Sequence, residues 1–169
     1  MAEYWDKRYL AQANWTKDTR QYLLEKIALK PDSRILEVGC GSMAVLREYL
    51  NKDYRLFGLD IDFNIMKQYQ NADPFIHKIN GDGNELPFES DHFDLCFCHF
   101  FLLWIFNPIK VILEMKRVLK KNGWLCCFAE PDYLSRIDYP EKLEKVGQLQ
   151  NESLNVQGAE LSSGRKTPE

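Results

Sequence analysis

Five short apolar runs, separated by helical or loop-like segments, constrain the fold more than any other feature of this chain. The runs are Arg34–Val38, Arg55–Leu59, Pro74–Ile79, Phe93–Phe100 and Trp124–Ala129. Helical patterns lie between or beside them, at Thr16–Leu29, Ala44–Leu50, Asn64–Gln70, Asn107–Lys120 and Pro140–Val156. This alternation favours an α/β fold with a mostly parallel sheet and helices on both faces. In such sheets ligands bind outside the carboxyl ends of the strands.

Composition excludes several other classes of protein. The 169 residues suit one domain with a real core, and the formal net charge of -3 argues against a basic nucleic-acid footprint. No apolar run approaches the ~20 residues that span a membrane, and the charged N-terminus has no apolar signal core. We therefore expect a cytoplasmic protein with no membrane span and no nucleic-acid partner.

The five cysteines predict no metal site and no disulfide framework. Their number is odd, no two of them form a C-x-x-C pair, and four of the five lie in apolar, strand-like runs. We interpret them as small buried hydrophobic residues.

A glycine pair stands where the first strand gives way to the next segment. Gly39 and Gly41 allow positive φ and leave no Cβ between the backbone and a ligand. Asp60 ends the next strand about 20 residues later, where a carboxylate can accept both ribose hydroxyl hydrogens. The stretch "GCGSMA" also satisfies the dinucleotide fingerprint G-x-G-x-x-G/A, so a nicotinamide dinucleotide remains an alternative ligand at this point.

Two further acids favour a different nucleoside. Glu37 lies inside the first strand, where a dinucleotide loop has little use for a carboxylate. Asp82, in a third loop, stands where an adenine amino group could be met. A hydrogen-bonded adenosine without a pyrophosphate fits these residues better.

Four motifs in order resemble a known family. "ILEVGCGS", "GLDID", "NGDGNELPFESDHFDL" and "EMKRVLKKNGWL" are similar to the motifs of class I S-adenosylmethionine-dependent methyltransferases that act on small molecules. The resemblance covers roughly residues 15–133. It implies a Rossmann-like three-layer sandwich of strand order 3-2-1-4-5 and S-adenosylmethionine as the cofactor.

The resemblance also implies roles for the adenosine side of the site. Asp60 would bind the ribose and Ile61 would flank the adenine. Asp82 would meet the adenine amino group, and Gly83 would supply a backbone contact.

On the methionine side, Glu37 and the loop of Gly39, Cys40 and Gly41 would border the amino acid of the cofactor. His99, at the end of the fourth strand, would lie near the methionine carboxylate or the methyl group. No metal ligand and no catalytic residue is implied.

Three positions complicate this assignment. Met43 replaces the family's usual third glycine, and we expect it inside the first helical turn, narrowing the pocket. Asn122 stands where the family carries a glycine, a mild change because Asn tolerates the left-handed conformation. Arg20 is interpreted either as a partner of the methionine carboxylate or as a solvated helix arginine.

The acceptor side lacks a specific signature. The fourth strand ends in "CHFFLLW" rather than in an N-P-P-Y type motif, which speaks against enzymes that methylate amino groups of DNA bases or glutamine. The segment "FFLLWIF" would give apolar and aromatic walls. We expect methyl transfer to a small molecule, with a cofactor-binding protein that has no turnover of its own as the alternative.

The family normally continues past the fifth strand with two more strands, which we expect to be absent here. We divide the chain into a methyltransferase-like domain at residues 1–157 and a polar tail at residues 158–169. The fifth strand would then be an apolar sheet edge, and such edges invite pairing. We expect a homodimer or heteromer through this edge, or a tail that covers it within one chain.

Overall fold

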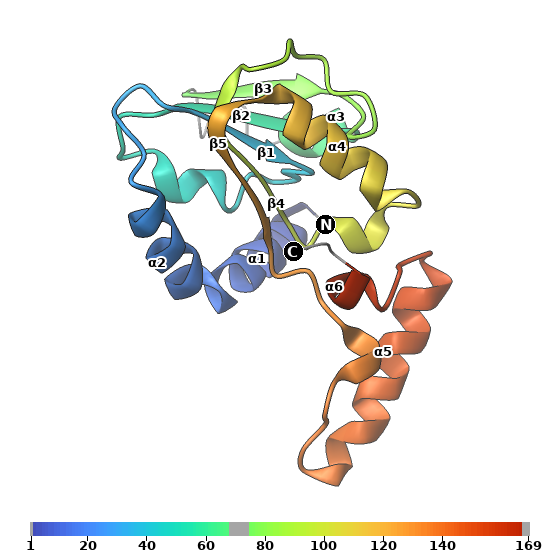
Figure 1. Ribbon diagram of the computed structural model, residues 1–169. Helices are drawn as coiled ribbons and strands as arrows, with labels where there is room; N and C mark the ends of the chain where they lie inside the picture. Colours follow the sequence, from blue (N-terminus) through green and yellow to red (C-terminus); the bar gives the residue numbers. More distant parts are fainter. Residues whose placement is uncertain (1, 68–74, 167–169) are drawn as a thin grey trace.

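A computed structural model describes residues 2–67 and 75–166, with side chains from residue 7 onward. Its centre is a parallel five-stranded sheet of order β3-β2-β1-β4-β5, so the predicted order is confirmed (Figure 1). The strands are β1 Arg34–Val38, β2 Arg55–Asp60, β3 Ile76–Asn80, β4 Phe93–His99 and β5 Leu119–Phe128.

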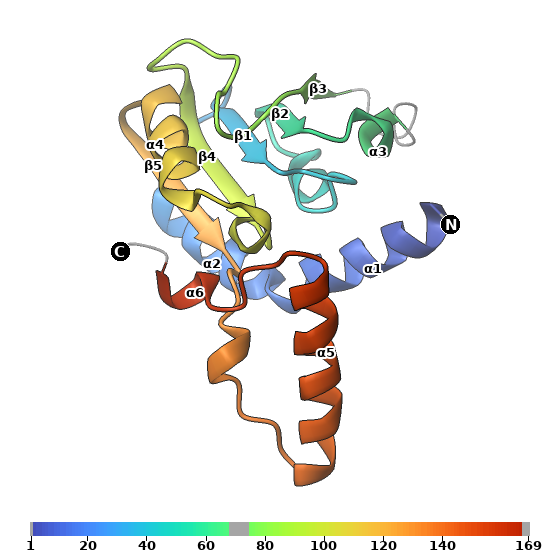
Figure 2. The same ribbon diagram turned by 90° about the vertical axis from the view of Figure 1, so that its right-hand side faces the viewer.

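Successive side chains along each strand point to opposite faces of the sheet, and a separate apolar core forms on each face. On one face Ile35 and Phe97 pack with Leu46 and Tyr49, which come from the 3-10 helix η1 (Leu46–Tyr49). On the other face Leu36, Cys96 and neighbouring side chains pack against α4 (Pro108–Val118), the helix that lies beside β4 and β5 in Figure 2. Both faces are therefore covered, as the predicted sandwich requires.

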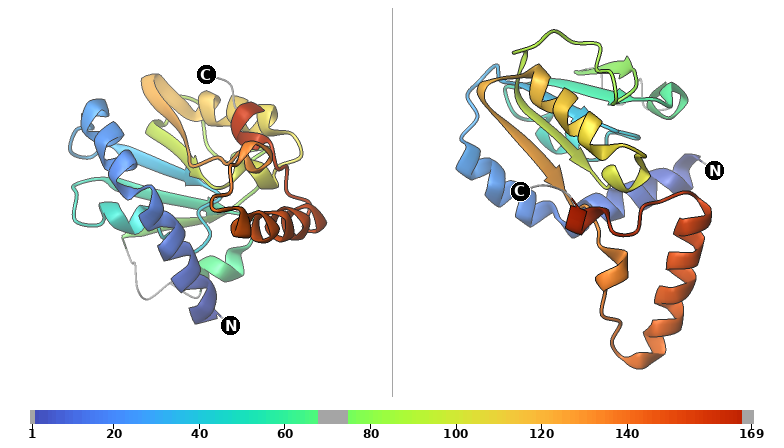
Figure 3. Two further views of the ribbon diagram at one scale, coloured as in Figure 1. Left: turned by 90° about the horizontal axis from the view of Figure 1, so that it is seen from below. Right: turned by 45° about the vertical axis from the view of Figure 1, so that its right-hand side comes forward.

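The remaining helices lie at the ends of the chain and after β2. They are α1 Ala2–Trp15, α2 Lys17–Ile27, α3 Phe63–Lys67, α5 Glu144–Val156 and α6 Ser163–Lys166, with short 3-10 turns at Leu102–Trp104 (η2), Tyr133–Ser135 (η3) and Glu141–Leu143 (η4). Helix α1 was not expected from the sequence. Helix α5 projects from the body as one side of an arm (Figure 3).

The segment after the glycine loop differs from the expected helix at Ala44–Leu50. Met43 takes a left-handed backbone with φ 61°, and only a 3-10 turn, η1, follows. The Met43 side chain is fully buried in the core and does not line the pocket described below. The expectation that Met43 lies in a helical turn and narrows the pocket was therefore wrong: the position keeps the glycine-like backbone, and its side chain points into the core.

Strand β5 begins earlier than expected, at Leu119, and includes the predicted turn "KKNG". The pairing of β4 with β5 shifts register between Phe93 and Leu95, which accommodates the extra residues of β5. Asn122 has φ 68°, so it does adopt the left-handed conformation that the sequence allowed.

The far edge of β5 pairs with no other strand of the described chain. The tail residues 158–166 do not lie along it, because their backbone hydrogen bonds go elsewhere. Tyr133 N donates to Leu161 O at 2.8 Å, and Gly164 N donates to Pro131 O at 2.9 Å. One of the two expectations was that the tail covers the edge of β5, and residues 158–166 do not cover it in the structure.

Candidate functional site

One large cavity opens at the carboxyl ends of the strands. Its volume is about 780 Å³, and its walls come from α1, the loops after β1, β2, β3 and β4, and α5. Eight of the ten predicted site residues line it: Glu37, Gly39, Cys40, Gly41, Asp60, Ile61, Asp82 and His99. The two others, Arg20 and Gly83, lie behind its walls.

Two features of the structure require a glycine at position 39 of the glycine loop. Gly39 and Gly41 have φ values of 72° and 48°, in the left-handed region that glycine adopts without strain. A Cβ on Gly39 would lie 2.1 Å from Cδ2 of the Phe101 ring, whereas one on Gly41 would meet nothing within 4 Å. Gly39 is therefore required by the ring packed on it as well as by its backbone angle.

Asp60 connects the loops after β1 and β2. Its Oδ2 accepts a hydrogen bond from Gly41 N at 2.8 Å, and its Oδ1 accepts one from Asp62 N at 2.9 Å. Each oxygen keeps a further lone pair, so the carboxylate is fixed in place and can still accept from hydroxyl groups in the cavity.

Glu37 lines the cavity but is only 3% exposed. Burial raises the pKa of its carboxyl well above the usual value, and the positive charge of Arg20 opposes that rise. Its Oε2 has no hydrogen-bond partner among the described residues, and the same holds for Oγ of the neighbouring Ser42. Both atoms need a polar partner from a ligand or from water.

The third loop brings Asp82 to the far end of the cavity. Asp82 Oδ1 accepts hydrogen bonds from Asn84 N at 2.8 Å and Asn84 Nδ2 at 2.9 Å, which lower the pKa of the Asp82 carboxyl. Ile61, in the loop after β2, also lines the cavity and is 74% exposed, so both side chains are accessible to a ligand. Gly83 is buried, and a Cβ there would lie 3.2 Å from both the Phe101 ring and Val38.

Arg20 corrects the sequence interpretation, because it is neither solvated nor in the pocket wall. Its side chain is completely buried, and its guanidinium pairs with Glu48 and donates to Ala13 O at 2.7 Å. His99 lies between Arg20 and the cavity. Burial and, secondarily, the Arg20 charge lower the pKa of His99 to about 4.

Sequence reasoning missed a carboxylate that shapes the wall. Glu130, just after β5, accepts hydrogen bonds from Phe101 N at 3.0 Å and Leu102 N at 2.9 Å. It thereby caps η2, which carries Leu103 and Trp104 into the cavity wall. Its only sequence signal was its place at the carboxyl end of a strand.

Another part of the cavity is lined by aromatic and neutral side chains. The segment after β4 contributes Phe100, Leu103, Trp104 and Phe106, and the turn after β5 contributes Tyr133. The sequence did not reveal the contributions of α1 and α5, which are Trp15 from α1 and Gln150, Ser153, Leu154 and Gln157 from α5 and its C-cap. Four charged residues also line the cavity: Arg8, Glu37, Asp60 and Asp82. Arg8 lies near enough to Tyr133 for its charge to oppose the rise that burial causes in the Tyr133 pKa.

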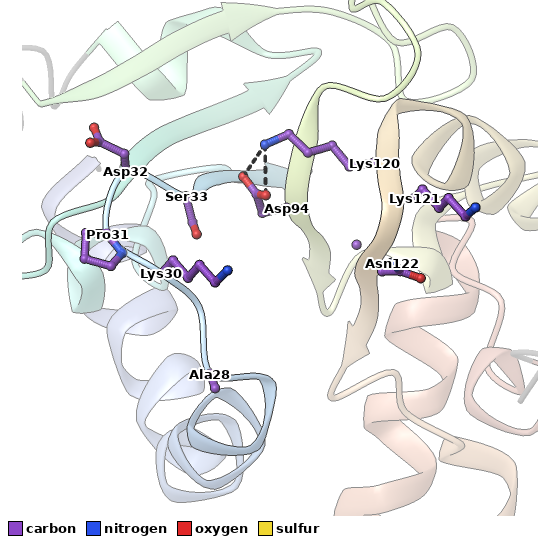
Figure 4. A pocket seen from close by; sticks show the side chains of 10 residues that line it. Ala28, Lys30, Pro31, Asp32, Ser33, Asp94, Lys120, Lys121 and Asn122 are labelled. Carbon is purple, nitrogen blue, oxygen red and sulfur yellow. Dashed lines mark hydrogen bonds and ion pairs between the residues drawn. The ribbon is translucent and has the colours of Figure 1, made fainter.

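A second hollow of about 370 Å³ lies at the opposite, amino edge of the sheet (Figure 4). Lys120 there is held by Asp94, with N–O distances of 2.9 and 2.8 Å. Lys121 is exposed, and the hollow lies far from the carboxyl ends where the predicted residues gather. None of the predicted site residues lines this hollow, so the large cavity is the candidate site.

Two features are absent from the described ranges, 2–67 and 75–166. No cluster of three or more His, Cys, Asp or Glu side chains there has a metal-binding arrangement. No helix in those ranges is long and apolar enough to cross a membrane. All five cysteines are free, with Cys40, Cys96 and Cys98 buried.

The chain is similar to known proteins of one kind. Residues 36–127 match the family model described as a methyltransferase domain. An uncharacterised methyltransferase of Schizosaccharomyces pombe is 29% identical over 93% of this chain and 62% of its own length. The demethylmenaquinone methyltransferase of Lysinibacillus sphaericus is 33% identical over 67% of this chain and 49% of its own length.

Among solved structures, an S-adenosylmethionine-dependent methyltransferase of Aquifex aeolicus superposes with a TM-score of 0.60 at 19% identity, over 78% of this chain and 77% of that one. This likeness concerns the fold. The chain spans only about half to two thirds of the length of the curated relatives it matches.

Proposed function

We propose that this chain, which belongs to the class I S-adenosylmethionine-dependent methyltransferases, transfers a methyl group from S-adenosylmethionine to a small molecule. The observation that carries the proposal is the gathering of eight predicted cofactor residues around one cavity. When bound, the cofactor would supply an electrophilic methyl group on a sulfonium, with the thioether as leaving group when an acceptor atom attacks the methyl carbon in line. The protein then has to bind the cofactor and the acceptor, orient them and exclude water from between them.

The residues present fit this cofactor. Asp60 has free lone pairs for the two ribose hydroxyls, and the unshared oxygen of Asp82 suits an adenine amino group. The unpartnered Oε2 of Glu37 suits an ammonium group, which would satisfy a buried acceptor. The ten assigned residues remain proposals, with Arg20 and Gly83 acting from behind the wall.

The acceptor side supports an uncharged, apolar and flat acceptor. Trp15, Phe100 and Trp104 offer ring faces and edges, while Gln150 and Gln157 offer neutral hydrogen-bonding groups. The name of the Lysinibacillus sphaericus relative gives demethylmenaquinone as its acceptor, and the aromatic wall supports an acceptor of that general kind. A cytoplasmic location and the absence of a nucleic-acid partner stay predictions from the sequence.

A second candidate is a protein that binds the cofactor without turnover, as a partner subunit. It is favoured by the edge of β5, which pairs with no other strand of the described chain. For either candidate we propose that a second polypeptide, most simply another copy of this chain, covers that edge. Methyl transfer by the purified chain alone to any quinol or phenol acceptor separates the two candidates.

Calorimetric titration tests the ligand itself. We expect S-adenosylhomocysteine and S-adenosylmethionine to bind, because Asp60 and Asp82 on successive loops serve one adenosine. NAD, which has no amino-acid ammonium group for the unpartnered Oε2 of Glu37, should bind much more weakly. Tighter binding of NAD than of S-adenosylhomocysteine would refute the proposal.

A further inference from the structure

A buried chain of hydrogen bonds leads from α2 to the cavity. Arg20 is completely buried, and its Nη2 donates to Ala13 O at 2.7 Å and pairs with Glu48. Its Nη1 donates to Thr16 Oγ1 at 2.6 Å. Thr16 Oγ1 lies 3.0 Å from His99 Nε2, and Arg20 Nη1 lies 3.3 Å from the same nitrogen.

The direction of these bonds follows from the chemistry of arginine. A guanidinium has five N–H donors and no acceptor, so Thr16 Oγ1 accepts from Arg20 and keeps its own hydrogen to donate. Both neighbours thus direct hydrogens at His99 Nε2. That nitrogen must be the acceptor of a neutral imidazole, and the single ring proton must lie on Nδ1.

The other ring nitrogen is left for a ligand. His99 Nδ1 makes no hydrogen bond to the described residues. It is also not one of the side-chain atoms that are both buried and without a partner, so it is accessible. His99 lines the cavity, and its ring stands edge-on to Phe100 with centroids 4.9 Å apart. The imidazole is therefore held by neighbours on one side and open on the other.

We propose that Arg20 and Thr16 are positioning residues that hold His99 as the neutral Nδ1–H tautomer, so that Nδ1–H donates to an oxygen of the ligand in the cavity. The identity of the ligand rests on the proposed function, whereas the tautomer is a property of the free protein. The low pKa of His99 agrees with an imidazole that stays neutral at pH 7. His99 is then a fixed hydrogen-bond donor and not the general base of the reaction.

Two oxygens would suit this donor: the carboxylate of the amino-acid part of the cofactor, and an oxygen of the acceptor. Both are hydrogen-bond acceptors on the ligand, and they differ in which molecule supplies them. S-adenosylhomocysteine carries the carboxylate, whereas 5′-methylthioadenosine is a nucleoside thioether without the amino acid. The pair therefore distinguishes the two sources.

The first experiment is long-range ¹H–¹⁵N correlation on the ¹⁵N-labelled free protein at pH 7. His99 is assigned by its loss in His99→Gln, which leaves His77 and His92 as internal references. We expect a protonated-type shift at Nδ1 and an unprotonated-type shift at Nε2. An Nε2–H tautomer or an imidazolium at pH 7 would overturn the proposal.

Variants test the positioning role in the same spectrum. Thr16→Val removes the hydroxyl donor while keeping the shape, and we expect the His99 signals to move towards a mixture of tautomers. Thr19→Val, at an exposed position of the same helix, is the matched control and should leave them unchanged. Identical His99 spectra in wild type and Thr16→Val would exclude a positioning role for Thr16.

Arg20→Gln removes the cation but risks the fold, so Arg20→Lys accompanies it. Lysine keeps the charge but replaces the planar guanidinium with a single ammonium group. It therefore cannot donate to Glu48, Thr16 and Ala13 with the same geometry. We expect the His99 pKa to rise in Arg20→Gln and the tautomer to become mixed in Arg20→Lys. A folded Arg20→Lys variant with unchanged His99 signals would exclude a positioning role for Arg20.

The ligand step uses calorimetry and the same nitrogen signals. If the oxygen belongs to the cofactor, S-adenosylhomocysteine shifts the Nδ1–H signal and methylthioadenosine does not, and His99→Ala weakens S-adenosylhomocysteine roughly 10-fold or more. If it belongs to the acceptor, the shift requires a quinol or phenol acceptor as well. An Nδ1–H signal that no bound ligand moves would overturn the donor role. Failure of both nucleosides to bind would refute the proposed function, while the spectrum of the free protein would still decide the tautomer.

Discussion

At the scale of the residue, the positions found by spacing were those whose role depends on the local backbone. Gly39, Gly41 and Asp60 follow from where one strand ends and the next begins, and the structure brings all three to one cavity. Arg20 could not be found in this way. Its environment depends on Glu48, 28 residues away in the sequence, and no local pattern encodes that pairing.

Asp60→Ala is expected to weaken S-adenosylhomocysteine binding by about 1.5–3 kcal/mol, the usual value for hydrogen bonds to a charged group. It should also lower the free energy of unfolding by ~1 kcal/mol or more, since Gly41 N and Asp62 N lose their acceptor. Calorimetry and urea denaturation measure the two effects. Asp62→Ala, at an exposed position that does not line the cavity, is the control for binding; equal affinity in Asp60→Ala and wild type would remove Asp60 from the site.

The low pKa of His99 makes the stability of the protein depend on pH. The unfolded chain takes up a proton at His99 near pH 6.5, whereas the folded protein resists it until about pH 4. Stability contributed by neutral His99 is therefore present above pH 6.5 and is lost as the pH falls towards 4. With each pKa unit worth about 1.4 kcal/mol, the loss approaches about 3 kcal/mol.

The buried carboxyls of Glu37 and Glu130 have raised pKa values, and their contribution has the opposite sign. The comparison is therefore made between wild type and His99→Gln, by urea denaturation at pH 7, 5.5 and 4. Wild type should lose more stability than the variant over this interval. Parallel losses in both proteins would contradict a depressed His99 pKa.

At the scale of the element, the strands were easier to predict than the segments between them. Four of five strand boundaries differ little from the apolar runs, because a covered strand must be apolar on both faces. The expected helix after β1 failed at Met43, whose left-handed backbone is incompatible with a helical turn. Apolar spacing cannot reveal such a backbone, because the buried methionine satisfies the helical pattern and the core equally well.

The contact between the glycine loop and η2 can be tested with paired substitutions. Gly39→Ala should lower the free energy of unfolding by roughly 2–5 kcal/mol, from left-handed strain plus the overlap with Phe101. Gly41→Ala, where the added methyl meets nothing, should cost only about 1–2 kcal/mol. Urea denaturation provides both values.

The double variant Gly39→Ala/Phe101→Ala isolates the ring. Because the overlap disappears with the ring, Gly39→Ala should cost less in the Phe101→Ala background than in wild type. A cost that is the same in both backgrounds would assign the whole requirement for glycine to the backbone angle.

At the scale of the whole molecule, the sandwich and its strand order could be predicted, but the full enclosure of the site could not. Residues of α1 and α5 close the cavity from outside the sheet, and both helices lie beyond the segment that carries the family motifs. Their polar composition gave no sign of a shared wall. Tyr9 and Gln150, for example, come from opposite ends of the chain and line the same cavity in the fold.

The open edge of β5 leads to the prediction on assembly. Trp124 is 51% exposed on this strand, Leu125, Cys126 and Cys127 are half-buried, and the described tail passes beyond the strand instead of pairing with it. An apolar strand with a free row of backbone N–H and C=O groups pairs readily with another chain. We therefore expect a dimer in light scattering at tens of micromolar protein, with β5 amides as protected from hydrogen exchange as those of β1.

A charge on the edge should undo this pairing without touching the core. Trp124→Lys places a cation on the exposed strand, as natural sheet edges do, and should yield monomers whose β5 amides exchange faster. Leu113→Lys, at an exposed position of α4, the helix that covers the other face of the sheet, is the control and should leave the dimer intact. A wild-type protein that remains monomeric at these concentrations, with β5 amides that exchange freely, would mean that this edge stays open in the purified chain and that its cover comes from a different partner.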